Sequence, residues 1–421
     1  MPSALSIVTD DADLAVEIAQ IGEQLGLSLA PRVVASPLSE ALDASGVLLL
    51  EAPSPEALVE LVRRGSTAVL GFIGPATVDL VGLGHDLGVP VVRETRALIA
   101  AVAMRSTGAP VWGAQTRAVP RAVRARLERA GWVVDRQGGK LTMMDGGLVG
   151  WQRDDERVLP LGEAPDVADA ASAIRRSGSG APPGRASVEG IDREAVREVL
   201  FGPGRALSDP ASKSALTPYG VPLPVEELCA SPSRAASEAA RIGFPVKLSL
   251  ASPDLRVWDH PDLVVLGAGS AAAVRDGFRT ITTMAAERDP SARLLGVHVT
   301  AEAASSLGLR VSLRPIGDLW ALAEIARSDD PERSTLAVLP TSAERVKSAL
   351  GRLGVSPSRG RGDIEALVDA LNRVAVFAVD QRDAVTSIRI DPLALLVGGG
   401  VELREACVVV NDLFERSLGA A

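Results

Sequence analysis

The stretch LSDPASKSALTPYGVPLP, residues 207–224, decides the fold of the second half of the chain. It predicts a helix over 210–217, followed by a glycine- and proline-rich segment. Around it, apolar periodicity predicts further helices at 192–200, 234–242, 271–287, 342–353 and 364–378. Runs of apolar and branched residues predict strands at 245–250, 263–266, 296–299, 309–314, 319–324 and 387–390. Interleaved helices and antiparallel strands are typical of an α+β domain.

The first hundred residues alternate short β-type runs with helical patterns. Strands are predicted at 5–9, 33–35, 47–50, 68–72 and 89–92, and helices at 13–25, 38–44, 55–64 and 75–87. Alternation at this spacing is typical of a parallel, doubly wound sheet with helices on both faces. The predicted class is therefore α/β, with a parallel N-terminal sheet and an α+β C-terminal half.

The region between these halves divides the chain further. We assign residues 1–105 to the first domain, 106–174 to a small α/β appendage, 175–190 to a linker and 191–421 to the last domain. The appendage contains a predicted hairpin over 140–161 that turns at the Asp-Gly-Gly of 145–147. The linker is too rich in glycine, serine and proline to pack into a core.

Composition excludes several classes of protein. The chain has 421 residues, 47% of them hydrophobic and 23% charged, and a net charge of −9, so it is a folded protein of two or three domains. The acidic balance argues against a nucleic-acid or membrane-surface partner. Cys229 and Cys407 are too few for a disulfide framework, and we expect both to be buried. With no basic leader and no run of about 18 uncharged apolar residues, we expect a cytoplasmic protein.

Lysines are scarce in this chain. Of 44 basic residues, Lys140, Lys213, Lys247 and Lys347 are lysines and the other 40 are arginines. Any chemistry that requires a lysine must use one of these four side chains.

Five blocks of the second half together resemble one enzyme family, the NDP-forming (ADP-forming) acyl-CoA synthetases, or acetate–CoA ligases. Residues 207–224 resemble its L-S-E-x-E-A-K…Y-G-I-P-V-P opening, 242–246 its I-G-Y-P-V and 252–255 its S-P-D-I. Residues 360–367 resemble its R-G…D-x-x-A-L block, and 388–392 its closing L-D-x-N-P. The five blocks occur in the family's order over about two hundred residues.

This resemblance implies an ATP-grasp domain, whose two α+β lobes close on a nucleotide. The first hundred residues resemble, less closely, a flavodoxin-like CoA-ligase domain of the same family, with Gly-Val-Pro-Val at 88–91 before a helix. The cofactors implied are ATP or ADP with magnesium, and CoA. The partner implied is a chain that has a CoA-binding or phosphohistidine domain, and a second copy of this chain is a further candidate.

The family's phosphate-binding lysine falls on Ser249, and Lys247 stands two residues earlier. Alternate residues of a strand share a face, so a displaced lysine at 247 could reach the same cleft from about 6–7 Å further along; otherwise Lys247 is a solvated strand-end residue. Asp254 and Glu324 complete the candidate nucleotide-binding residues. Asp391 is the remaining candidate for a metal ligand in the closing block.

Other positions depart from the family pattern. The H-K-S/T-D-V-G-G motif falls on 257–263, where the sequence is VWDHPDL, and the glycine-rich loop falls on the apolar 319–325. Arg389 replaces the acid of the closing motif, where a positive charge would oppose magnesium. His260, between Asp259 and Asp262, is a weaker metal-site candidate, because polar residues in a proline turn are usually solvated.

The sequence contains neither a complete phosphohistidine motif nor a complete receiver-domain pocket. No S-H-T-G phosphohistidine motif occurs, and His85 and His298 are interpreted as structural or surface residues. The acids of 10–13 resemble the pocket of phosphoacceptor receiver domains, but the third predicted strand ends in Leu-Glu-Ala rather than in an aspartate.

Two functions follow from this comparison. The first is a degenerate acyl-CoA synthetase-like pseudoenzyme, a binding, regulatory or scaffold subunit with no catalytic residue of its own. The second is an active ATP-grasp acyl-CoA ligase subunit that uses the shifted Lys247 and a partner chain. The pattern of retained structural positions and replaced phosphate and metal positions favours the first.

Overall fold

The computed structural model describes residues 5–9, 11–25, 29–34, 47–50, 54–63, 69–72, 80–92, 95–106, 115–116, 125, 140–152, 158–163, 165–167, 170–171, 173, 187–355 and 361–412. The chain divides into two compact units, Met1–Pro182 and Pro183–Ala421, each described here by itself. The expected linker, 175–190, lies outside the described residues except for its last four positions. None of the helices within the described ranges is long and apolar enough to cross a membrane.

The first unit begins with a five-stranded parallel sheet of order β2-β1-β3-β4-β5. Its strands are β1 (Leu5–Thr9), β2 (Leu29–Val33), β3 (Val47–Leu50), β4 (Val69–Phe72) and β5 (Val91–Val92). Its helices are α1 (Ala12–Leu25), α3 (Pro55–Arg63), α4 (Leu80–Leu87) and α5 (Thr95–Ser106). This order is the flavodoxin-like one, which confirms the predicted parallel sheet. The second strand begins four residues earlier than predicted, and the helix expected at 38–44 lies outside the described residues.

A second sheet, of order β6-β7-β8-β9, extends this unit. Its strands are β6 (Gln115–Thr116), β7 (Lys140–Met143), β8 (Leu148–Gln152) and β9 (Leu159–Glu163). β7 and β8 form the predicted hairpin, in which Gly146 and Gly147 adopt φ of 81° and 83° in the turn. β9 packs against α5, where a Cβ on Gly162 would lie 3.3 Å from the Ala100 side chain.

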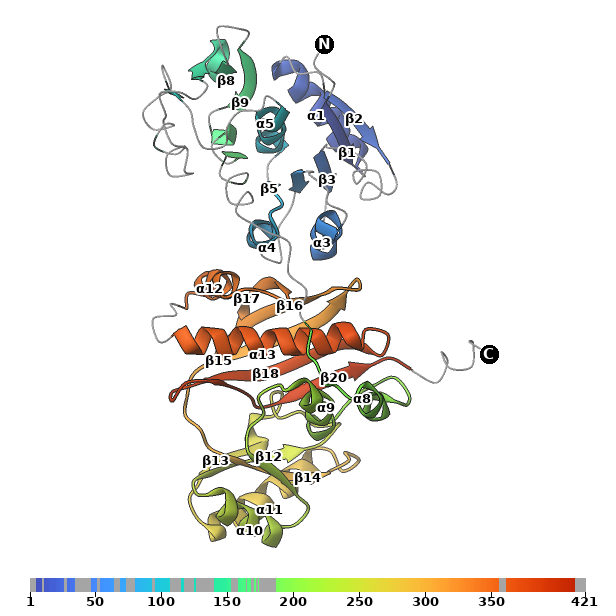
Figure 1. Cartoon of the computed structure of the whole chain (residues 1–421), viewed down its shortest axis with the longest axis vertical. Helices are drawn as coiled ribbons and strands as arrows, with labels where there is room; N and C mark the ends of the chain where they lie inside the picture. Colours follow the sequence, from blue (N-terminus) through green and yellow to red (C-terminus); the bar gives the residue numbers. More distant parts are fainter. Residues whose placement is uncertain are drawn as a thin grey trace, which may run out of the picture. The chain divides into compact units, whose positions relative to one another are not determined.

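The second unit has a small lobe built on an antiparallel sheet of order β11-β14-β12-β13. The strands are β11 (Glu226–Cys229), β12 (Val246–Ala251), β13 (Val264–Ala268) and β14 (Gly296–Ala301). The helices α10 (Pro232–Ile242) and α11 (Ala271–Arg288) pack on one face of this sheet and form a shared apolar core with it (Figure 1). Ser231 and Ser270 cap the two helices by accepting hydrogen bonds from the backbone N–H three residues on.

The large lobe is built on a second antiparallel sheet, of order β10-β20-β18-β15-β16-β17, with β19 paired to β18. The strands are β10 (Arg205–Ala206), β15 (Ser305–Ile316), β16 (Trp320–Arg327), β17 (Asp330–Leu339), β18 (Val385–Leu396), β19 (Val401–Leu403) and β20 (Ala406–Val410). The long helix α13 (Arg361–Asp380) and α12 (Ala343–Arg352) lie along one face, and α8 (Arg193–Leu200) and α9 (Asp209–Leu216) lie near β20 (Figure 1). Both cysteines are buried and free, as expected.

The 207–224 stretch connects the two lobes. After α9, a short 3-10 turn at Thr217–Tyr219 ends at Gly220, whose φ of 67° favours glycine. The Tyr219 side chain is fully buried, and its ring meets that of Phe377 on α13 edge to face, with centroids 5.2 Å apart. The chain then continues to β11 of the small lobe.

Candidate functional site

One face of the small-lobe sheet is polar. Lys247 and Ser249 on β12 lie opposite Thr300 and His298 on β14, and Glu226 on β11 also lies opposite Thr300. Residues directly opposite in antiparallel strands point to the same side, so these five side chains share one face. The alternate residues of the same strands face the α10 and α11 core. The prediction that Lys247 and Ser249 share a face is therefore confirmed.

Charged side chains of the large-lobe elements meet this polar face. Lys213 Nζ on α9 lies 2.8 Å from Asp209 Oδ2 and 2.8 Å from Glu226 Oε1. Lys247 Nζ lies 2.9 Å from Oε1 of Glu405, in the turn between β19 and β20. These five residues and His298 are called the charged cluster below. Because buried ions need partners, the cluster links the two lobes through paired charges.

Burial and charge shift the pKa values inside the charged cluster. Burial, with the nearby Glu405 charge, raises the pKa of Asp209 to about 7. Burial acts to lower the pKa of Lys213, but the charges of Asp209 and Glu226 outweigh it and raise that pKa. Burial alone would raise the pKa of Glu405, yet the charges of Lys247 and Lys213 hold it below its usual range. Lys213 therefore stays protonated within the cluster.

His298 is the uncharged member of the charged cluster. Its side chain is buried, and its Nε2 lies 3.4 Å from Asp209 Oδ2, while its Nδ1 lies 3.9 Å from Glu226 Oε1. Neither ring nitrogen makes a hydrogen bond with the described residues. Burial lowers the pKa of His298, which favours the neutral ring. Asp, Glu and His are metal-ligand types, and these three groups lie within 4.8 Å of one another, but the Lys213 ammonium already binds both carboxylates.

Asp391 lies on β18 of the large-lobe sheet, and its carboxylate is already bound. Arg310 Nε donates to Asp391 Oδ2 at 2.6 Å, and Ser328 Oγ donates to Oδ1 at 3.0 Å. An Arg389 terminal nitrogen lies 3.6 Å from Oδ2. The predicted metal ligand therefore has two guanidinium groups as its neighbours.

Trp258 and Arg389 meet across the two lobes. The Arg389 guanidinium lies 4.7 Å from the centroid of the Trp258 ring, a cation–π contact. Both residues stand at positions where the sequence departs from the resembled family. Trp258 follows β12 in the small lobe and Arg389 lies on β18 of the large lobe, so the contact joins the two lobes.

The remaining predicted site residues lie apart from the charged cluster. Asp254 is bound by Arg293, whose terminal nitrogen lies 2.6 Å from Oδ1, and these hydrogen bonds lower the pKa of Asp254 to about 2. Glu324 is exposed on β16, on the sheet face opposite α13. It lies opposite Ser312 on β15, and Ser312 in turn lies opposite Arg389 on β18. The structure therefore brings together Lys247 and Ser249 but holds Asp254 in a separate ion pair. Their roles with a nucleotide stay predictions.

The weaker candidates from the sequence are also placed. Asp262 forms a bidentate pair with Arg288, at 2.9 and 2.7 Å, and Asp259 is exposed. Asp10 and the His85 side chain lie outside the described residues. Sequence reasoning missed Glu226 and Glu405, while Asp209 and Lys213 carried a signal, because acid and lysine four residues apart on a helix can pair.

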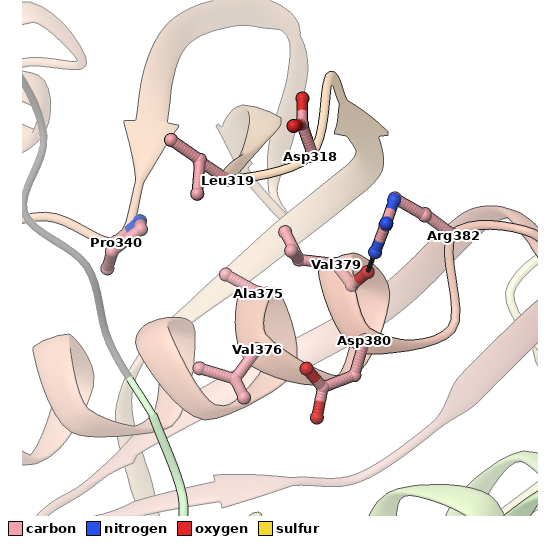
Figure 2. Close-up of a pocket in the computed structure, with 8 residues that line it drawn as sticks. All are labelled: Asp318, Leu319, Pro340, Ala375, Val376, Val379, Asp380 and Arg382. Atoms are coloured by element: carbon pink, nitrogen blue, oxygen red, sulfur yellow. Dashed lines mark hydrogen bonds between the residues drawn. The ribbon is translucent and has the colours of Figure 1, made fainter.

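The hollow drawn in Figure 2 lies elsewhere in the large lobe. It has a volume of about 290 Å³ and lies between the C-terminal half of α13, the turn before β16 and the end of β17. Its lining residues are Asp318, Leu319, Pro340, Ala375, Val376, Val379, Asp380 and Arg382. Figure 2 shows Arg382 bonded to the Val379 carbonyl oxygen, at 3.0 Å. This hollow contains none of the charged-cluster residues.

Comparison with known proteins identifies the domain. Residues 198–315 match the family model of the ATP-grasp domain. The chain is 24% identical over 240 residues to the β subunit of ADP-forming acetate–CoA ligase II of Pyrococcus furiosus, covering 51% of this chain and 94% of that one. It is 30% identical over 111 residues to the β subunit of ADP-forming acetate–CoA ligase I of the same organism, covering 25% of this chain and 48% of that one.

A solved structure is also similar. It is a dinucleotide-forming acetyl-coenzyme A synthetase of Ca. Korarchaeum cryptofilum in complex with coenzyme A and Ca-AMPCP, with a TM-score of 0.43 and 22% identity, covering 49% of this chain and 94% of that chain. The ATP-grasp match, at residues 198–315, falls on the half that has the charged cluster. The chain contains an ATP-grasp domain and is homologous to the β subunits of ADP-forming acetate–CoA ligases.

Proposed function

We propose that this chain is a non-catalytic binding, regulatory or scaffold subunit related to the ADP-forming acyl-CoA synthetases. One observation supports this most directly: the charged groups of the lobe interface already bind one another. Lys247 is paired with Glu405, and Asp391 is paired with Arg310. Phosphoryl transfer needs a cation for the phosphates and carboxylates for magnesium, and neither is available while these pairs hold.

The energetics favour the paired state. If Lys247 turned to a phosphate, Glu405 would remain buried without its partner. Removing one partner from a buried ion pair costs about 3–5 kcal/mol. A nucleotide would have to offset this cost before it gained any affinity.

The surroundings of Asp391 do not fit a magnesium ion. Both carboxylate oxygens accept hydrogen bonds from protein donors, and the positive charges of Arg310 and Arg389 stand beside them. Magnesium binds through several oxygen ligands, and neighbouring positive charges repel it. Asp391 is therefore not available as a magnesium ligand in this arrangement.

The test of this proposal is a paired binding and activity measurement. We expect the full chain to show no acid- and CoA-dependent ATP consumption, and no micromolar binding of ATP with magnesium by calorimetry. The contrary result is tight ATP–magnesium binding that Lys247→Ala abolishes. Lys347→Ala is the matched control, because Lys347 is an exposed lysine on α12.

The second candidate is an active ligase subunit that works with a partner chain. Its support is that the named relatives are β subunits, and that Lys247 and Ser249 share the interface face with His298. In this candidate the partner supplies a CoA-binding domain and a phosphohistidine. ATP consumption that appears only after a co-expressed partner is added, and requires both acid and CoA, would favour it over the first.

A further inference from the structure

Two arginines, one from each lobe, have buried donor groups without acceptors. In the small lobe, Arg256 follows β12, and both its terminal nitrogens are buried and make no hydrogen bond with the described residues. In the large lobe, Arg389 lies on β18, and its Nε is likewise buried and unbonded. These two residues are called the arginine pair.

The arginine pair lies at the end of the lobe interface that contains Cys407 and Trp258. Arg389 and Cys407 lie directly opposite each other in β18 and β20, so their side chains share a face. Burial raises the pKa of the Cys407 thiol, and the charges of Arg256 and Arg389 act against that rise. Arg256 and Trp258 share one turn, in which the Arg256 carbonyl oxygen accepts from the backbone N–H of Asp259. The Trp258 ring lies 4.7 Å from the Arg389 guanidinium, so the geometry places both arginines at this end of the lobe interface.

The nearby carboxylates cannot satisfy the arginine pair. Asp391 lies 3.6 Å from an Arg389 nitrogen, but Arg310 and Ser328 already donate to its two oxygens. Asp254, which is close in sequence to Arg256, is held by the side chain and backbone of Arg293. The positive charge of Arg256 thus has no bonded counter-charge in the described part of the chain.

Burying a guanidinium without hydrogen-bond acceptors costs free energy, and a bound anion would reduce that cost. An unpaired charged donor loses the hydration of its N–H groups and gains nothing in return. The Trp258 ring lies over the Arg389 guanidinium, and the Arg389 side chain is 34% exposed. A planar guanidinium presents parallel N–H groups that match two oxygens of one phosphate.

We propose that Arg256 and Arg389 form a magnesium-independent binding site for a phosphoryl group at the lobe interface. The site rests on the proposed function, since it gives a non-catalytic subunit its class of ligand. Phosphate oxygens would accept hydrogen bonds from Arg256 and from the Nε of Arg389, and the arginines would supply the positive charge that a metal ion otherwise supplies. Inorganic phosphate, pyrophosphate and the diphosphate of a nucleotide share this chemistry.

The test is titration calorimetry of the full chain with sodium pyrophosphate in the presence of EDTA. We expect binding to the unmodified chain, with affinity at least tenfold weaker in both Arg256→Gln and Arg389→Gln. Arg275→Gln is the matched control, because Arg275 is an exposed arginine on α11, and it should bind as the unmodified chain does. A thermal melt of each variant shows whether it is folded. Arg256→Lys keeps the positive charge but loses the parallel N–H groups of the guanidinium, so it should bind pyrophosphate more weakly than the unmodified chain.

Parallel titrations with phosphate, ADP and acetate distinguish the sources of the anion. Binding of pyrophosphate or ADP without magnesium, lost in the glutamine variants, supports the site. Binding of acetate alone, binding that needs magnesium, equal binding by all variants, or no binding at all overturns it. Absence of binding together with absence of ATP consumption would remove this site and leave the proposed function standing, whereas acid-dependent ATP consumption would remove the proposed function.

Discussion

The charged cluster and the arginine pair occupy the same lobe interface and differ in one respect. In the charged cluster, the lysine ammonium groups of Lys213 and Lys247 each meet a carboxylate at 2.8 to 2.9 Å. In the arginine pair, buried nitrogens of Arg256 and Arg389 meet no acceptor in the described part of the chain. The lysines of the cluster have their counter-charges without a ligand, while Arg256 has none in the described part of the chain. This difference separates a structural role, holding the lobes together, from a binding role.

The largest expected effect is on the charged cluster. Lys213→Met removes the ammonium between Asp209 and Glu226 and leaves a buried and a partly buried carboxylate without it. Breaking a buried pair in this way costs about 3–5 kcal/mol. Urea unfolding followed by circular dichroism should show a loss of that size in the free energy of unfolding.

The control for this prediction is Lys347→Met on α12. Its exposed side chain should change the free energy of unfolding by about 0.5 kcal/mol or less. Equal losses in the two variants would mean that the charged cluster does not hold the lobes together.

The second effect is a pH dependence that the arginine pair should lack. The pKa of Asp209 is raised to about 7 in the folded state, so the folded protein binds a proton more strongly than the unfolded chain does. This contribution to stability is present below the ordinary pKa near 3.8 and is lost as pH rises through about 7. Between these two pKa values, the free energy of unfolding should fall by up to about 1.4 kcal/mol for each pH unit. Unfolding free energies measured from pH 4 to 8 should show the slope and Asp209→Asn should remove it.

His298 acts in the opposite direction and must be separated from Asp209. Its pKa is lowered in the folded state, so its contribution is present above the ordinary value of 6.5 and is lost as pH falls. His298→Gln should therefore steepen the decline of stability with rising pH that Asp209 causes. An Asp209→Asn profile parallel to that of the unmodified chain would contradict the raised pKa.

The sequence predicted the elements of the fold better than the partners within the site. Periodicity located α11 and α13, and residue alternation placed Lys247 and Ser249 on one face. The strand β17 was missed because its first residues, DPER, are charged and exposed, and only its second half is buried. No local pattern marks such a strand, since its register with β16 supplies the stabilisation.

The cluster itself could be predicted only in part. Asp209 and Lys213 lie four residues apart on α9, a spacing that is visible in the sequence. Glu226 is brought to Asp209 and Lys213 by the pairing of β11 with β14. Glu405 lies in a turn nearly two hundred residues after Asp209, and tertiary packing brings it to Lys247. Contacts of such separation are set by tertiary packing, and a single sequence has no signal for them.

The smallest effect distinguishes the two regions most sharply. Arg256→Met removes a buried guanidinium whose terminal nitrogens have no acceptor, and it leaves an apolar side chain of similar length. Without ligand we expect stability to be unchanged or to rise by about 1 kcal/mol, the reverse of the loss expected for Lys213→Met, because removing an unsatisfied donor relieves its desolvation cost. Urea unfolding in phosphate-free buffer with EDTA measures this. A loss above about 2 kcal/mol would show that Arg256 is a structural residue like Lys213, and the contrast between the charged cluster and the arginine pair would then fail.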